Sequence, residues 1–255
     1  MPSPDRYSRR SHLTFVAPAV SNTMSVAPGT GTTTSGRTVL RIASGLAVAG
    51  AVAIIVASRL HGGTDPAELQ TVLPQYAANP HWKTAHLGQF VGFLFVMSSL
   101  IILLNHLRNM SGSVVALLGI VSAGTTTAVF AVNQAVDGVA IRYVAENWVN
   151  AAPEGRAGAM VLAQAVRHIE QGASALVAFN LGVTLLLCGT AMFTTRVLSK
   201  GLGAAALVVG VAYIATGVTL YYVGFAAHVL TFWSSALLLI WLASVAYALW
   251  QEGGR

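Results

Sequence analysis

The sequence predicts an all-α membrane protein, a bundle of six transmembrane helices whose two termini both face the cytoplasm. Of its 255 residues, 55% are hydrophobic and only 9% are charged, whereas soluble domains are usually about 25% charged. The apolar residues fall in six blocks, each close to the ~20 residues that a helix needs to cross a bilayer. None of the blocks alternates with period two, and only helices or closed barrels satisfy their backbone groups in lipid. The blocks span approximately residues 38–60, 84–107, 113–136, 173–193, 202–223 and 229–250.

The distribution of basic residues sets the predicted orientation. With six spans, both termini lie on one side, and nine of the 14 Lys and Arg residues lie there against five on the other side. Cytoplasmic loops carry an excess of Lys and Arg, so we expect a plasma-membrane protein with cytoplasmic termini. The net charge of +6 does not indicate nucleic-acid binding, because the basic residues form no stripe and no aromatic-interleaved motif.

The chain before the first span is rich in Ser, Thr, Pro and Gly, and we expect residues 1–36 to form a disordered cytoplasmic tail. Residues 37–251 then form the membrane domain. No signal-peptide pattern precedes the first span, which is expected to be an uncleaved anchor, and Met24 is an alternative start to Met1. The single cysteine, Cys188, lies inside the fourth span, where we expect a small buried apolar side chain.

The loop between the first and second spans predicts a short amphipathic helix on the outer surface. Leu69, Val72, Leu73 and Tyr76 recur at the spacing of one helix face. The preceding TDPAE has the composition of a helix start. Pro74 lies inside this pattern and is expected either to kink the helix or to end it.

The other loops predict how the spans pair. The inner loops RNMSG and TTRVLSKG are short, so spans two and three, and spans four and five, should be antiparallel neighbours. The outer loop at about residues 138–167 has one strong breaker, PEG at 153–155, so its flanks are expected to project from the lipid as a helical hairpin. Glycines recur every seven residues along one face of span five, which favours close approach of another helix. These are Gly203, Gly210, Gly217 and Gly224.

Ionisable and amide side chains gather at the outer ends of spans two, three and four. Their spacings of three or four residues place them in groups on shared helix faces. Ionisable groups that face the interior of a membrane bundle usually serve a function. We therefore predict an outward-facing polar pocket. Its candidate residues are His86, Gln89, Asn133, Gln134, Asp137, His168 and Glu170.

Asp137 has two interpretations. Near the interface a carboxylate costs little, so it could be a surface group paired with Arg142 or Arg167. Alternatively, it faces the histidines or Glu170 across the bundle. The spacings of Arg167 with Glu170 and of Arg142 with Glu146 predict ion pairs, which usually lie on solvated helix ends and contribute little.

Histidines with carboxylates suit zinc, copper or iron. The candidate metal ligands, or acid–base groups, are His86, Asp137 and Glu170, whose side chains we predict to converge. No HExxH or CxxC motif is present, so the ligands of any metal would come from different helices. A haem is not favoured, because its axial histidines would be drawn from His86, His168 and His228, which lie close to the membrane surface. A His–carboxylate pair also suits proton relay or acid–base catalysis.

The segments HWKTAHLGQFVGFL, QAVDGVAIR and AVRHIEQG resemble a widespread group of bacterial multi-pass membrane proteins of unknown function, common in actinobacteria. The resemblance runs from about residue 41 to 225 and implies the same span order and outer loops. It adds no chemistry. An aromatic residue often stands at the place of His168 in that group, which favours His86, Asp137 and Glu170. The positions that carry the resemblance are Trp82, His86, Gln89, Gln134, Asp137, Arg167 and Glu170.

Three hypotheses for function follow. The first is a component that binds, senses or transports a small or lipophilic molecule in the outward-facing pocket. The second is a membrane-embedded enzyme, with or without a metal, acting on a lipid-soluble substrate. The third is a structural or interaction component whose polar residues only join helix ends. Few polar residues lie in the inner halves of the spans, which disfavours an ion channel.

Overall fold

The computed structural model describes residues 34–62, 68–111, 113–195 and 198–254, which belong to one compact unit. The predicted tail lies outside the described residues as far as residue 33, and residues 34–36 already belong to the first helix. The elements are α1 (Thr34–His61), α2 (Leu69–Ala78), α3 (Trp82–Ser111), α4 (Val114–Ala135), the π-helical turn η1 (Val136–Ile141), α5 (Arg142–Asn150), α6 (Arg156–Thr195), α7 (Lys200–Val223), the 3-10 turn η2 (Gly224–Ala227) and α8 (His228–Glu252).

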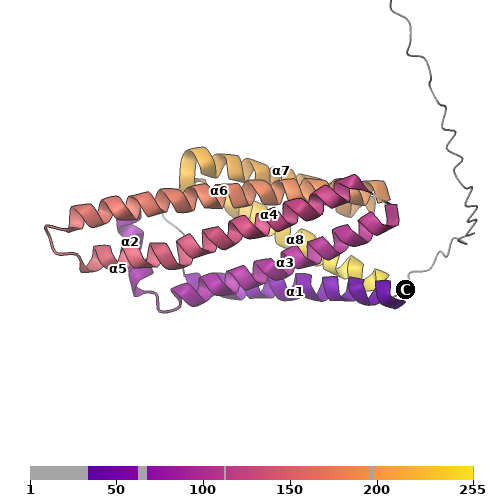
Figure 1. Ribbon diagram of the computed structural model, residues 1–255, viewed down its shortest axis with the longest axis horizontal. Coiled ribbons are helices and arrows are strands. Elements are labelled where there is room, and N and C mark those ends of the chain that lie inside the picture. The colour runs from indigo at the N-terminus through magenta and orange to yellow at the C-terminus, as the bar shows by residue number, and fades with distance from the viewer. Residues whose placement is uncertain (1–33, 63–67, 112, 196–197, 255) are drawn as a thin grey trace, which may run out of the picture. The chain divides into compact units, whose positions relative to one another are not determined.

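In the described part of the chain, six helical segments are long and apolar enough to cross a membrane: α1, α3, the continuous α4–η1–α5, α6, α7 with most of η2, and α8. Each overlaps one of the predicted apolar blocks, which confirms the six-span all-α fold (Figure 1). Gly253, just after α8, lies against Arg41 of α1, because a Cβ there would be 2.8 Å from the Arg41 Cγ. Both ends of the unit therefore lie at one end of the bundle, which we call the proximal end. The opposite end, where α1 ends and α3 begins, is the distal end.

Two helix pairs pack backbone to backbone through glycines. A Cβ on Gly182 of α6 would lie 2.6 Å from the carbonyl oxygen of Gly210 in α7, and one on Gly210 would lie 2.9 Å from that of Gly182. Gly50 of α1 and Gly92 of α3 make the same contact at 2.6 and 2.8 Å. The predicted packing role is thus confirmed for the glycines of α7, since Gly203 and Gly217 also lie against α6. The fourth predicted glycine, Gly224, instead follows α7 with a φ of 73°.

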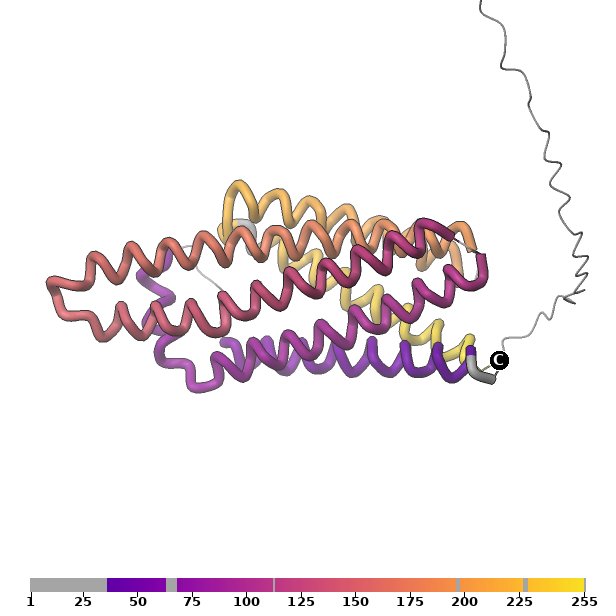
Figure 2. Tube along the Cα trace, in the orientation of Figure 1, coloured from indigo at the N-terminus to yellow at the C-terminus, as the bar shows by residue number. Residues whose placement is uncertain are grey.

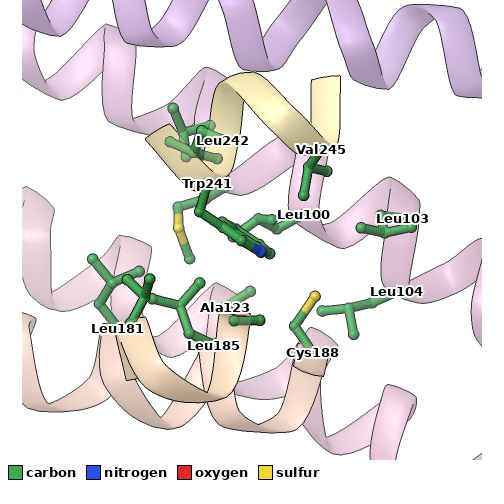
Figure 3. Close-up of a cluster of buried hydrophobic side chains, with 14 of the residues drawn as sticks. Leu100, Leu103, Leu104, Ala123, Leu181, Leu185, Cys188, Trp241, Leu242 and Val245 are labelled. Carbon is green, nitrogen blue, oxygen red and sulfur yellow. The ribbon is translucent and has the colours of Figure 1, made fainter. Parts of the chain in front are cut away.

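The middle of the bundle is an apolar core. Trp241 of α8 reaches in toward Leu104 of α3 and toward Leu185 and Cys188 of α6 (Figure 3). Its indole N–H donates to the carbonyl of Leu202 at 3.0 Å. The Cys188 side chain is fully buried, as predicted. This packing lies between the distal polar residues and the proximal end.

The helices α5 and α6 form a hairpin that projects beyond the other spans at the distal end (Figure 2). At ~1.5 Å per residue, the 40 residues of α6 extend about 60 Å, twice the ~30 Å of a hydrocarbon core. The predicted breaker lies in its turn, because α5 ends at Asn150 and α6 begins at Arg156. The apolar face of α2 packs on this hairpin, burying Val72, Leu73 and Tyr76. The helix continues through Pro74 to Ala78, so this proline does not end it.

Candidate functional site

The π-helical turn η1 shapes the distal end of the bundle. It widens the helix by one residue per turn just after α4 and contains Asp137 and Gly138. Such turns are rare and occur frequently at functional sites. Gly138 lies against His86 of α3, since a Cβ there would be 2.7 Å from the Cβ of His86. The missing side chain therefore lets η1 come close enough for Asp137 to reach the imidazole.

His86 and Asp137 face each other directly. Nε2 of His86 lies 3.0 Å from Oδ2 of Asp137, and the two side chains are 2% and 17% exposed. Nδ1 of His86 lies 2.7 Å from the backbone carbonyl of Trp82. A carbonyl only accepts hydrogen bonds, so Nδ1 carries a hydrogen and donates it to Trp82. This contact fixes the orientation of the ring and directs Nε2 at the carboxylate.

Trp82 holds both partners of this pair. Its carbonyl accepts from His86, and its indole N–H donates to the backbone carbonyl of Asp137 at 3.0 Å. The indole is buried and packs on three other rings, with centroid distances of 4.6 Å to His86, 4.6 Å to His61 and 4.2 Å to Tyr76. The start of α3 and the turn η1 are thereby held in one register.

A third side chain, that of His61, lies beside this pair, and His61 is the last residue of α1. Its ring centroid lies 5.0 Å from that of His86. One ligand atom from each of His61, His86 and Asp137 lies within 4.8 Å of the others. The helix stops here because Gly62 takes a φ of 82°, and because the Asn79 amide donates to the His61 carbonyl at 2.8 Å. We call these three residues the distal cluster.

Arg142 does not serve as the partner of Asp137. It binds Glu146 at 2.5 Å, as its spacing predicted, and donates to the carbonyl of Asn79 at 2.6 Å and to that of Tyr76. These bonds attach the end of α2 to α5. Within the described residues, the ionic contact of Asp137 is with His86. The interpretation that pairs Asp137 with an arginine is therefore wrong.

Glu170 lies outside the distal cluster. Both of its carboxylate oxygens accept from Arg167, at 3.0 and 2.8 Å, and the side chains of Glu170 and Arg167 are 3% and 11% exposed. The Arg167 guanidinium also lies over the ring of Phe225, 4.1 Å from its centroid. The pair is therefore buried beside the turn between α7 and α8, and is not the solvated helix-end pair expected from its spacing.

A cavity of about 400 Å³ lies between the helices on the proximal side of the distal cluster. Its walls are mostly apolar, and polar side chains from α1, α3, α4 and α6 line part of it: Ser58, Gln89, Asn133, Gln134 and Ser174. Ser174 donates to the Asn133 amide oxygen at 2.9 Å, and Gln89 lies 3.5 Å from the Ser58 hydroxyl. Among the described residues, the buried oxygen Oε1 of Gln134 accepts no hydrogen bond.

Three helical segments each contribute one residue to the distal cluster and, one turn away, one residue to the cavity wall. Ser58 precedes His61 by three residues on α1, and Gln89 follows His86 by three on α3. Asn133 precedes Asp137 by four at the end of α4. On each helix the cavity residue therefore lies about one turn nearer the proximal end than the cluster residue.

No family model, no curated protein and no solved structure matches this chain. The resemblance to actinobacterial membrane proteins accordingly stays a prediction. The assignment of a site rests on the geometry alone.

The predicted pocket residues divide into three places. His86 and Asp137 meet, and Gln89, Asn133 and Gln134 line the cavity one turn below them. Glu170 is held by Arg167, and His168 is exposed and lines a separate hollow beside η2. The side chain of His228, weighed as a haem ligand, lies outside the described residues. Sequence reasoning missed His61 as a site residue, because it follows the first apolar block at the start of the outer loop, and nothing in the sequence says which way its side chain faces.

Proposed function

We propose that this chain is a multi-pass plasma-membrane protein that binds a small amphiphilic molecule in the cavity between its helices. The termini face the cytoplasm and the distal end faces outward. The observation that carries the proposal is the cavity itself, whose volume of about 400 Å³ falls within the ~300–1,000 Å³ of small-molecule sites. Like those sites, it combines apolar walls with a few convergent polar groups.

The chemistry of the lining indicates what the molecule carries. Its body is apolar, because side chains such as Phe93, Val96 and Leu238 form most of the wall. Its polar group is a hydrogen-bond donor, because the buried oxygen of Gln134 needs one and leaving it unsatisfied costs about 1–3 kcal/mol. A long-chain or cyclic alcohol has both features.

Binding is favoured over passage through the bundle. The core around Trp241 and Leu185 fills the bundle next to the cavity with buried apolar side chains. A molecule in the cavity cannot pass on to the proximal end unless this core opens. We therefore propose a binding or sensing role. The second candidate is an enzyme acting on the bound molecule, which the position of the distal cluster one turn away favours.

The test compares 1-dodecanol with its methyl ether, which lacks the donor hydrogen, as stabilisers of the detergent-purified protein. The alcohol should raise the thermal midpoint more than the ether does. Ala178→Phe, which fills a buried position on the cavity wall, should reduce affinity for the alcohol at least tenfold, or about 1.4 kcal/mol. Gln134→Leu should abolish the difference between alcohol and ether while leaving the fold intact.

Ala128→Phe is the matched control, since it adds the same ring to an exposed face of α4. It should bind as the wild type does. If neither compound stabilises the wild type, or if Ala178→Phe binds the alcohol unchanged, the cavity is not a ligand site.

A further inference from the structure

We propose that His61, His86 and Asp137 bind one divalent transition-metal ion at the distal end of the bundle. The proposal stands on the geometry of the distal cluster and does not rest on the ligand proposed for the cavity. Its first support is the number of groups: three helical segments, the end of α1, α3 and η1, each contribute one ligand atom to a volume in which no two are more than 4.8 Å apart.

The second support is the donor and acceptor state of His86. Its Nδ1 hydrogen is directed at the Trp82 carbonyl, so in the neutral ring Nε2 carries a lone pair. That lone pair faces a carboxylate oxygen only 3.0 Å away. Two acceptors at this distance repel each other unless a proton, carried by either group, or a metal ion lies between them.

His61 distinguishes these two cations. A proton shared between His86 and Asp137 needs no third group, whereas a metal ion does. A second imidazole is present within ligand range, and its ring is only partly exposed. Its Nδ1 lies 3.3 Å from the Gly62 carbonyl, which leaves Nε2 as a lone-pair donor in the neutral ring. Two imidazoles and one carboxylate are a set that zinc and ferrous sites use.

The surroundings of His86 are those of a metal ligand. Metal-bound histidines almost always donate their other N–H to a carbonyl or carboxylate, which fixes the tautomer and ring orientation. The Trp82 carbonyl does this here, and the Trp82 indole at the same time fixes the backbone of Asp137. A buried ring with this support is already oriented before an ion arrives.

The distances between the three ligand atoms would fit a metal ion after a small movement of His61. In a tetrahedral zinc site with bonds of ~2.0 Å, the ligand atoms lie about 3.3 Å apart. His86 and Asp137 already meet this spacing at 3.0 Å. His61, at the end of α1 beside Gly62, can approach by turning its side chain. Three protein ligands leave at least one position for water or for a polar group of a bound molecule.

The ligand set also indicates the class of ion. Imidazole nitrogens suit zinc, copper, iron and nickel, whereas magnesium and calcium prefer oxygen ligands. We therefore expect Zn²⁺ or Fe²⁺ to bind and Mg²⁺ not to bind.

The experiment uses tag-free full-length protein in detergent, treated with a chelator and then titrated with Zn²⁺, Fe²⁺ or Mg²⁺. The wild type should bind one Zn²⁺ or one Fe²⁺ per chain and no Mg²⁺ at equal concentration. Cobalt substitution should give visible absorption bands of a low-coordinate nitrogen and oxygen site. His61→Ala should weaken Zn²⁺ binding at least tenfold, and Asp137→Asn at least a hundredfold.

His168→Ala is the matched control, because it removes an exposed distal histidine that lies outside the cluster. It should bind as the wild type does. Helix content and elution volume of each variant report folding, and His61, partly exposed at a helix end, is the replacement least expected to disturb it. The proposal is overturned if the folded wild type binds no stoichiometric ion, or if His61→Ala and Asp137→Asn bind with wild-type affinity. Equal losses in His168→Ala would show adventitious surface binding and overturn it as well.

Discussion

Asp137 and Glu170 are two carboxylates at the distal end of one bundle, and they have different kinds of partner. Glu170 accepts two hydrogen bonds from the Arg167 guanidinium, which has donors only and carries a permanent charge. Asp137 faces an imidazole nitrogen whose ring already donates its hydrogen elsewhere. The first charge is balanced within one turn of α6. A proton or a metal ion that joins the pair would balance the second. Burial alone therefore does not separate the two carboxylates, whereas the donor state of each partner does.

The largest effect that should separate the two carboxylates is on stability. Glu170→Gln leaves the buried Arg167 charge without its counter-ion, and we expect it to lower the free energy of unfolding by about 3 kcal/mol. Zn²⁺ affinity should stay at the wild-type value. Thermal unfolding in detergent and a Zn²⁺ titration measure the two quantities.

Glu146→Gln is the control for this variant, since it breaks the other arginine pair at a side chain that is 46% exposed. It should cost about 0–1 kcal/mol. If Glu170→Gln instead released the metal while stability hardly changed, Glu170 would belong to the ligand set predicted from the sequence and our separation of the two carboxylates would be wrong.

A smaller effect is expected where η1 meets α3. Gly138→Ala places a methyl group 2.7 Å from the Cβ of His86, so the ring or the turn must move. Overpacking of this kind costs about 1–3 kcal/mol, and the displaced ring should bind Zn²⁺ about tenfold more weakly.

Gly158→Ala in α6 is the control, because a Cβ there has no neighbour within 4 Å. It should leave Zn²⁺ binding unchanged and should stabilise the helix slightly, since alanine is the better helix former. Wild-type affinity in Gly138→Ala would mean that the position of His86 does not govern the ion.

The sequence predicted the spans well, because apolar length and loop length are local properties. The block ending near residue 136 and the PEG breaker placed α4 and the hairpin turn at the residues observed. The glycine repeat of span five indicated close packing, although its partner glycines in α6 were not identified. The tail to residue 33 and the orientation in the membrane stay predictions.

The site was predicted less completely, because helix rotation decides which polar residues meet. His86 and Asp137 meet, as one of the two interpretations expected. Glu170 was taken for their partner because it lies at a similar depth, yet an arginine three residues earlier on its own helix holds it. The π-helical turn η1 changes the direction in which the Asp137 side chain leaves the helix, and no sequence pattern predicted that turn.

The smallest effect concerns the tryptophan that joins the two halves of the distal cluster. Trp82→Phe keeps an aromatic ring but removes the N–H that donates to the Asp137 carbonyl at 3.0 Å. Loss of one such bond should lower the free energy of unfolding by about 1 kcal/mol. A less restrained Asp137 should also weaken Zn²⁺ binding by about threefold, which corresponds to ~0.7 kcal/mol. Trp241→Phe loses an equivalent 3.0 Å bond to the Leu202 carbonyl in the apolar core, so it should show the stability loss without the change in affinity. Equal Zn²⁺ losses in both variants would mean that affinity follows global stability, whereas a loss confined to Trp82→Phe would show that this indole positions the metal site.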